Sequence, residues 1–181
     1  INGEKPCIYM GFRPGVTREE WKRCFDEQDI PAMLSCLHRF DVQPGETYLI
    51  KGGVPHAIGA GCLLIEIQEP IRTERITPAG LRIADFMCHQ GLGFDRMFDC
   101  FHYDGLTKEE AYASWCVPTK VLERTPEYVR SEIIGHSQTP CFRLERYDIS
   151  GSCTIPAGNV FCGLYIFAGT GRMVSDAGTQ D

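Results

Sequence analysis

The chain has 181 residues, of which 43% are hydrophobic and 23% charged, the composition of a soluble globular protein. It is long enough to bury a hydrophobic core without disulfide or metal cross-links. Its formal charge of −6 excludes broad nucleic-acid binding, which needs a basic field, so specific Arg or Lys groups must hold any anionic ligand. Apolar runs of membrane-spanning length and a basic-then-apolar N-terminal segment are both missing, so we expect no membrane partner.

The ten cysteines never stand at the C-x-x-C spacing of zinc ribbons or redox pairs. Several lie inside apolar runs, as Cys62 and Cys162 do. Because free cysteine is among the most often buried residue types, we interpret them as small hydrophobes in a reducing cytosol. The alternative is a disulfide framework in a secreted protein.

In chain order, the apolar run Cys7–Met10 after Pro6 predicts a strand. Because the sequence starts almost directly on this strand and without Met, we expect it to enter a domain part-way through. Thr17-Arg-Glu-Glu20 is a capping box that predicts a helix to about Gln28. Pro31 begins a second helix, which is predicted over 32–39 with Met33, Leu34 and Leu37 facing inward.

A hairpin is the central prediction. The Pro44-Gly45 turn opens a short apolar strand that ends at Lys51, and the Gly-Gly pair 52–53 breaks it. The run 62–68, rich in branched residues, predicts the second strand, with Glu66 and Gln68 on one face. His56 follows Pro55 between the two strands, where a barrel wall can present a metal ligand.

The remainder is mixed and then β-rich. After a polar segment over 70–80, helices are predicted at 94–101 and, from the capping box Thr107-Lys-Glu-Glu110, to about Trp115. Beyond residue 118 the pattern indicates short strands within 118–129 and further strands at 141–149, 154–156 and 161–167. A glycine hairpin is predicted at 169–171.

The hairpin carries a resemblance to a known family. The spacing Gly45, five residues, Lys51, any residue, Gly53, two residues, His56 resembles the second motif of the cupin superfamily, in which proline stands at the position of Lys51. The longer string 44–68 resembles the type I mannose-6-phosphate isomerases, which are metal-dependent cupins. The resemblance extends through Ile8-Tyr-Met-Gly-Phe12 and the helices, and on to Gly105.

This resemblance implies the fold class and the domains. We expect a mainly β protein of double-stranded β-helix (cupin, jelly-roll) type, with a small helical insertion over 17–40. The first cupin domain, N-terminally incomplete, would span 1–115. The β-rich residues 116–181 resemble the start of a second cupin-like barrel.

The chemistry of such an isomerase asks for particular groups. Interconversion of an aldose and a ketose phosphate moves a proton between adjacent carbons through an enediol(ate). A divalent metal can stabilise the developing negative charge as a Lewis acid, and a planar cation such as Arg can hold an oxyanion or phosphate. A base must also reach the carbon-bound proton.

The resemblance implies that His56 is a zinc ligand. The family's other ligands, a Gln, a His and a Glu, are expected upstream of Ile1. Without the resemblance, a lone histidine in a loop is more often structural or solvent-exposed, since one ligand is too few for a metal site. The histidines at 38, 89, 102 and 136 have no ligand-like spacing, and we predict structural roles for them.

Four further residues are candidates for the site. Arg72 resembles the family's catalytic arginine, although the Ser/Thr-Asp segment that precedes that arginine is missing between Pro70 and Ile71. Either the loop is shortened or two segments are joined across a mobile one. Arg75 is the fallback for Arg72 and a candidate for substrate binding. Glu66 is a candidate base or a hydrogen-bond acceptor near the metal, and Lys51 is a candidate phosphate ligand. The structural alternatives are a solvated arginine, a paired carboxylate and a solvated lysine.

The resulting hypothesis is a zinc-dependent isomerase of mannose 6-phosphate and fructose 6-phosphate in the cytoplasm. Its partner would be a small sugar phosphate, and a homo-oligomer is left open. The alternatives are a non-catalytic sugar-binding or regulatory cupin, and another metal-dependent cupin enzyme such as a dioxygenase or a different sugar isomerase.

Overall fold

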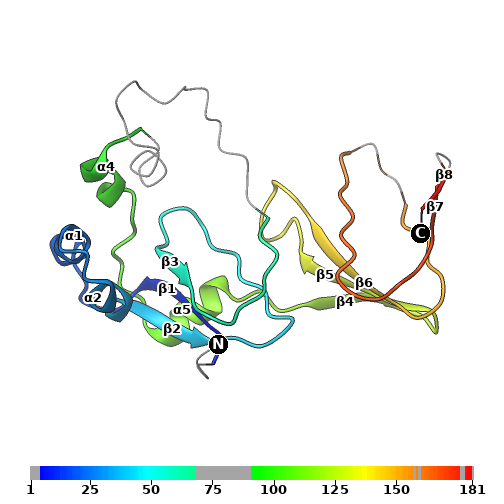
Figure 1. Cartoon of the computed structure of the whole chain (residues 1–181), viewed down its shortest axis with the longest axis horizontal. Coiled ribbons are helices and arrows are strands. Elements are labelled where there is room, and N and C mark those ends of the chain that lie inside the picture. The colour runs from blue at the N-terminus through cyan, green and yellow to red at the C-terminus, as the bar shows by residue number, and fades with distance from the viewer. Residues whose placement is uncertain (1–4, 68–90, 157, 159, 176–177, 181) are drawn as a thin grey trace.

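The computed structural model describes residues 5–67, 91–156, 158, 160–175 and 178–180. In this part the chain forms small antiparallel sheets and a few short helices, so the protein is β-rich. A closed barrel is not among the described sheets, and the cupin barrel stays a prediction. Figure 1 shows the first sheet and its helices on the left, and the later strands on the right.

The first sheet has the strand order β2-β1-β3, and its members are β1 Cys7–Phe12, β2 Leu37–Asp41 and β3 His56–Ile58. The central strand β1 pairs antiparallel with both neighbours, with Met10 opposite His38 on one side and His56 on the other. The predicted strand at 7–10 is confirmed and is two residues longer. The fold therefore places three separate sequence segments side by side at the predicted histidine.

Two helices connect β1 to β2, as the capping box at Thr17 and the break at Pro31 predict: α1 Arg18–Asp26 and α2 Ile30–Ser35. The Thr17 side chain accepts a hydrogen bond from the Glu20 N–H at 3.2 Å, which satisfies one free donor of the first turn. The second helix ends earlier than predicted. Residues 37–39 belong to β2, because pairing with β1 outweighs the helical spacing of the apolar side chains.

Two more helices follow the segment 68–90, which lies outside the described residues: α4 Phe94–Asp99 and α5 Lys108–Trp115. Both were predicted, and α5 begins with the full capping box, in which Thr107 and Glu110 exchange hydrogen bonds. These bonds to Thr107 hold the pKa of Glu110 below its usual range. Helix α5 covers the core face of the first sheet.

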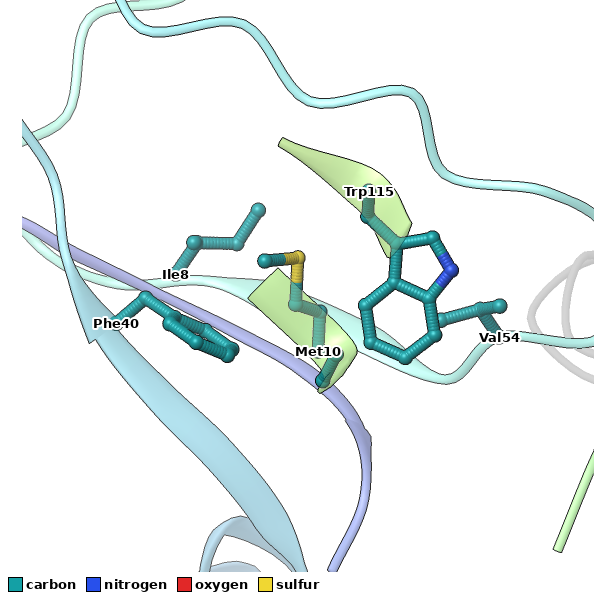
Figure 2. Close-up of a cluster of buried hydrophobic side chains, with 6 residues drawn as sticks. Ile8, Met10, Phe40, Val54 and Trp115 are labelled. Atoms are coloured by element: carbon teal, nitrogen blue, oxygen red, sulfur yellow. The ribbon is translucent and has the colours of Figure 1, made fainter. Parts of the chain in front are cut away.

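The first core cluster lies between this sheet and α5 (Figure 2). Ile8 and Met10 of β1 pack with Phe40 of β2, and Trp115 packs beside Val54. Met10 is fully buried. A second cluster joins the other end of β1 to the helices, and its buried members are Phe12, Trp21, Cys36, Leu37 and Phe98. Together the clusters fix the position of the sheet that carries His56.

The chain then enters a second sheet of order β4-β5-β6, with β4 Lys120–Arg124, β5 Tyr128–Ile134 and β6 Leu144–Ile149. A two-stranded ladder of β7 Met173–Ser175 and β8 Gly178–Gln180 ends the described part. Segment 47–49 holds the chain between α5 and β4, since Leu49 N–H donates to the Trp115 carbonyl and Val117 N–H donates to the Thr47 carbonyl. The domain boundary near residue 115 stays a prediction.

Several strand predictions are wrong. Residues 154–156 and 161–167 form no strand, and the predicted buried run is exposed, with Phe161 98% accessible. The glycine segment 169–171 is not a hairpin turn between strands, because β7 begins only at Met173 and pairs with β8. Strand propensity alone does not make a strand: a segment needs a neighbour that satisfies its backbone groups.

The cysteine prediction holds in part. The nine cysteines that the structure describes are free thiols. Cys7, Cys24 and Cys36 are buried, and burial raises the pKa of Cys36 to about 11, so this thiol is a hydrophobic packing group. Cys100, Cys141 and Cys162 are exposed instead. Finally, the described helices include none that is long and apolar enough to cross a membrane.

Candidate functional site

The first residue of strand β3 is His56, whose backbone is held on both sides. Just before it, the Pro55 carbonyl accepts a hydrogen bond from Gly11 N–H at 2.8 Å. Just after the strand, Gly59 N–H donates to the Cys7 carbonyl at 2.8 Å. The ladder between β1 and β3 therefore extends beyond the three paired residues, and it fixes the position of the His56 Cα.

The imidazole of His56 is exposed, and one of its nitrogens is already bound. Nδ1 lies 3.1 Å from the Val54 carbonyl oxygen. A carbonyl oxygen can only accept, so Nδ1 must carry the proton, and in the neutral ring Nε2 then has the free lone pair. A histidine whose other ring N–H is bound to a carbonyl is the usual form of a metal-binding or proton-accepting imidazole.

The turn before His56 explains why the histidine stands where it does. Val54 N–H donates to the Lys51 carbonyl at 3.3 Å and closes a turn. Gly53 has φ +82°, a conformation that strains other residues. The Val54 side chain is buried beside Trp115 (Figure 2), so the chain is anchored in the core two residues before the histidine.

Tyr48 anchors the segment that leads into this turn. Its hydroxyl donates to Glu46 Oε2 at 2.8 Å, and its backbone forms a bridge with Cys116. Burial, with the Glu46 carboxylate nearby, raises the pKa of Tyr48 above its ordinary value. The phenol therefore stays protonated at neutral pH, and its part is structural.

The predicted hairpin is wrong in both of its strands. Residues 46–51 form no strand and contain only the isolated bridge of Tyr48 with Cys116. Residues 62–67 follow the histidine, but they form no strand and pair with no neighbour in the described part of the chain. Leu63 is 88% exposed, and Glu66 is exposed as well. The partner of β3 is β1, which precedes it by more than forty residues. Glu66 is accordingly no inward-facing strand residue in this structure.

The remaining predicted site residues divide into two groups. Lys51 is exposed at the start of the turn, and its side chain has no ion pair within the described residues. Arg72, Arg75 and Gln68 lie outside the described residues. Lys51, His56 and Glu66 are thus the candidates within the described residues, and Lys51 and His56 lie on either side of one turn.

The described residues do not by themselves form a metal centre. They contain no group of three or more His, Cys, Asp and Glu side chains placed to hold one ion. Zinc sites in proteins use three or four such ligands, so one imidazole with a free Nε2 does not suffice. Within the described residues His56 is thus the one ligand that the resemblance implies, and zinc binding stays a prediction.

Two hollows of the described surface lie elsewhere. One, of about 260 Å³, is lined by Arg13, Glu20 and Ser35 among others. Another, of about 380 Å³, includes Lys120 and Glu132. Neither contains Lys51, His56 or Glu66, so the candidate site is an open turn and not one of these hollows.

Sequence reasoning missed one residue near the turn. His102 follows α4, and its backbone N–H donates to the Gly53 carbonyl at 2.8 Å. Its ring lies so close to Gly53 that a Cβ atom there would be 2.7 Å from Nε2. No spacing in the sequence relates His102 to His56, because only the fold brings residues 53 and 102 together.

Comparison with known proteins adds one relationship. The chain is 26% identical over 163 residues to the "Probable mannose-6-phosphate isomerase GmuF" of Bacillus subtilis (strain 168), a match that covers 88% of this chain and 46% of the relative. The chain thus spans about half the length of this relative. Protein-family models and solved structures give no match. The similarity supports a distant relationship to mannose-6-phosphate isomerases and agrees with the resemblance of the histidine segment.

Proposed function

We propose that the protein is an aldose–ketose isomerase that interconverts mannose 6-phosphate and fructose 6-phosphate in the cytoplasm. The observation that carries the proposal is the similarity to a probable mannose-6-phosphate isomerase along 88% of the chain. The geometry of His56 supports it: the imidazole is exposed, its backbone is fixed by β1, and its Nε2 lone pair is free.

The reaction assigns tasks to particular side chains. A carbon-bound proton must move between C1 and C2 of the sugar, and the groups proposed to assist are Glu66 as base and Arg72 as the cation near the enediolate oxygens. Lys51 and Arg75 are the proposed phosphate contacts. Because the formal charge of the chain is −6, such local cations are what would attract a dianionic substrate.

A divalent ion of the zinc type stays part of the proposal as the cofactor, with His56 as one ligand. The further ligands are not among the described residues. The catalytic steps above are therefore assigned to side chains only. Any assembly of the protein into a homo-oligomer is likewise left to measurement.

A coupled isomerase assay on the full-length protein tests the function. We expect fructose 6-phosphate to form from mannose 6-phosphate, turnover to stop on treatment with a chelator, and added Zn²⁺ to restore it. His56→Ala should lower turnover at least a hundredfold, whereas His136→Ala, at an exposed histidine in the loop after β5, should not. Turnover that survives both chelation and His56→Ala would overturn the proposed mechanism.

The same experiment separates the alternative functions. Saturable binding of a sugar phosphate without turnover would indicate a non-catalytic sugar-binding cupin. Turnover of a different sugar, or consumption of oxygen, would indicate another cupin enzyme. Metal content measured on the purified protein, together with a panel of sugar substrates, distinguishes these outcomes.

A further inference from the structure

His102 lies beside the turn that precedes His56. Its ring packs against Gly53, where an added Cβ would come within 2.8 Å of His102 Cδ2 and 2.9 Å of the Cys100 carbonyl oxygen. Its backbone N–H binds the Gly53 carbonyl. The imidazole is exposed and has no hydrogen-bond partner within the described residues. A basic aromatic ring is thus held by its own backbone at the edge of the candidate site.

The turn itself offers further donors. The backbone N–H groups of Gly52 and Gly53 form no hydrogen bond to any described residue. The space above Gly52 is open, since a Cβ there would meet nothing within 4 Å. The Lys51 ammonium precedes these two amides and is without an ion pair in the described part of the chain. Backbone amides without a side chain in the way can approach an anion closely.

We propose that His102 is a further substrate-binding residue, which contacts the phosphoryl group of the sugar phosphate together with Lys51 and the two glycine amides. The identity of the ligand rests on the proposed function. A phosphate monoester carries several acceptor oxygens, and an ammonium, two amides and an imidazole provide the matching N–H donors. The residues come from two segments, 51–53 and 102, which only the fold brings together.

Variants of the full-length enzyme test this proposal by separating KM from kcat. His102→Leu removes both ring nitrogens and keeps the backbone contact with Gly53, because that bond comes from the main-chain N–H. We expect about a tenfold rise in KM for mannose 6-phosphate with little change in kcat, the loss of one charge-assisted hydrogen bond. The matched control His136→Leu should leave KM unchanged. An unchanged KM in His102→Leu would count against the proposal.

A binding measurement on the wild-type protein decides the matter even if a variant does not fold or turnover is missing. The probes are inorganic phosphate and fructose 6-phosphate, with unphosphorylated fructose as the control. In histidine-ring NMR spectra, the His102 signals should shift with both phosphates and not with fructose, whereas the His136 signals should stay. His102 signals that do not respond to either phosphate overturn the inference. Shifts without isomerisation would reject the proposed reaction and keep His102 as a phosphate contact.

Discussion

The indole of Trp115, at the end of helix α5, lies directly on Gly11 near the end of strand β1. A Cβ atom at Gly11 would overlap this ring, and the backbone there has φ +71°. Trp115 also contacts Val54, two residues before His56 (Figure 2). One tryptophan therefore links the strand, the helix and the segment that carries the candidate histidine.

Gly11→Ala should destabilise the protein by about 2–4 kcal/mol, because the new methyl group must displace the indole and the backbone must adopt a strained φ. Gly15→Ala is the matched control: its φ is +88°, but nothing lies within 4 Å of its added Cβ. The control should lose only about 1 kcal/mol from backbone strain. Urea unfolding followed by tryptophan fluorescence measures both, and equal losses would show that contact with Trp115 does not matter.

Local signals in the sequence predicted the parts of the fold that short-range physics decides. Both capping motifs, at Thr17 and Thr107, begin helices where predicted, because an N-cap needs only residues within one turn. The strand at 7–10 was also found. Ile8 and Met10 stand at alternate positions of this strand and are buried on the same face, which gives the apolar pattern that the prediction used.

Strand pairing between segments far apart in the sequence decided the elements that were predicted wrongly. Residues 37–41 have apolar spacing that fits the end of a helix, yet β1 recruits them as β2. Residues 62–67 and 161–167 have strand-like composition but find no partner in the described chain. Of the candidate site, the sequence identified His56 from its motif and Lys51 from its place just before the Gly-Gly pair. His102 could only be found once the fold placed it on Gly53.

The capping box of α5 predicts a second measurable loss. The Thr107 hydroxyl donates to Glu110 Oε2 at 2.8 Å and accepts from Glu110 N–H at 3.3 Å. Thr107→Ala should lower the free energy of unfolding by about 1 kcal/mol, since it leaves the first-turn N–H without its acceptor. Thr107→Ser keeps the hydroxyl and should be close to wild type. A Ser variant as unstable as the Ala variant would contradict a capping role.

A salt bridge in the second sheet predicts how stability depends on pH. Arg130 of β5 binds Glu145 of β6 through two hydrogen bonds of 3.0 and 2.8 Å. The guanidinium holds the pKa of the Glu145 carboxyl below its usual range. Since the folded pKa is lower than the unfolded one, the pair stabilises the protein above the unfolded pKa of about 4.3, and this stabilisation is lost as the pH falls through the folded pKa.

Glu145→Gln should therefore lower the free energy of unfolding by about 1.5–3 kcal/mol at pH 7, and the difference from wild type should shrink at pH 3. Asp148→Asn removes the exposed pair with Arg146 and should cost less than about 1 kcal/mol at either pH. Urea unfolding at the two pH values measures both variants. A Glu145→Gln deficit that is equally large at pH 3 would show that the carboxylate charge is not its cause.

The two histidines opposite Met10 are predicted to be opposite tautomers when neutral. His56 binds the Val54 carbonyl through Nδ1, and His38 binds the Leu106 carbonyl through Nε2 at 2.7 Å. Since a carbonyl only accepts, His56 should carry its proton on Nδ1 and His38 on Nε2. Nitrogen-15 NMR of the rings at pH 8 distinguishes the two forms by which nitrogen is protonated. Of these two histidines, His56 is the one that is exposed with a lone pair on Nε2, so added Zn²⁺ should perturb its ring and leave the buried His38 unchanged. A His56 ring protonated on Nε2 would mean that the nitrogen left for a ligand is the one facing Val54, and His56 could not then bind a metal in this backbone conformation.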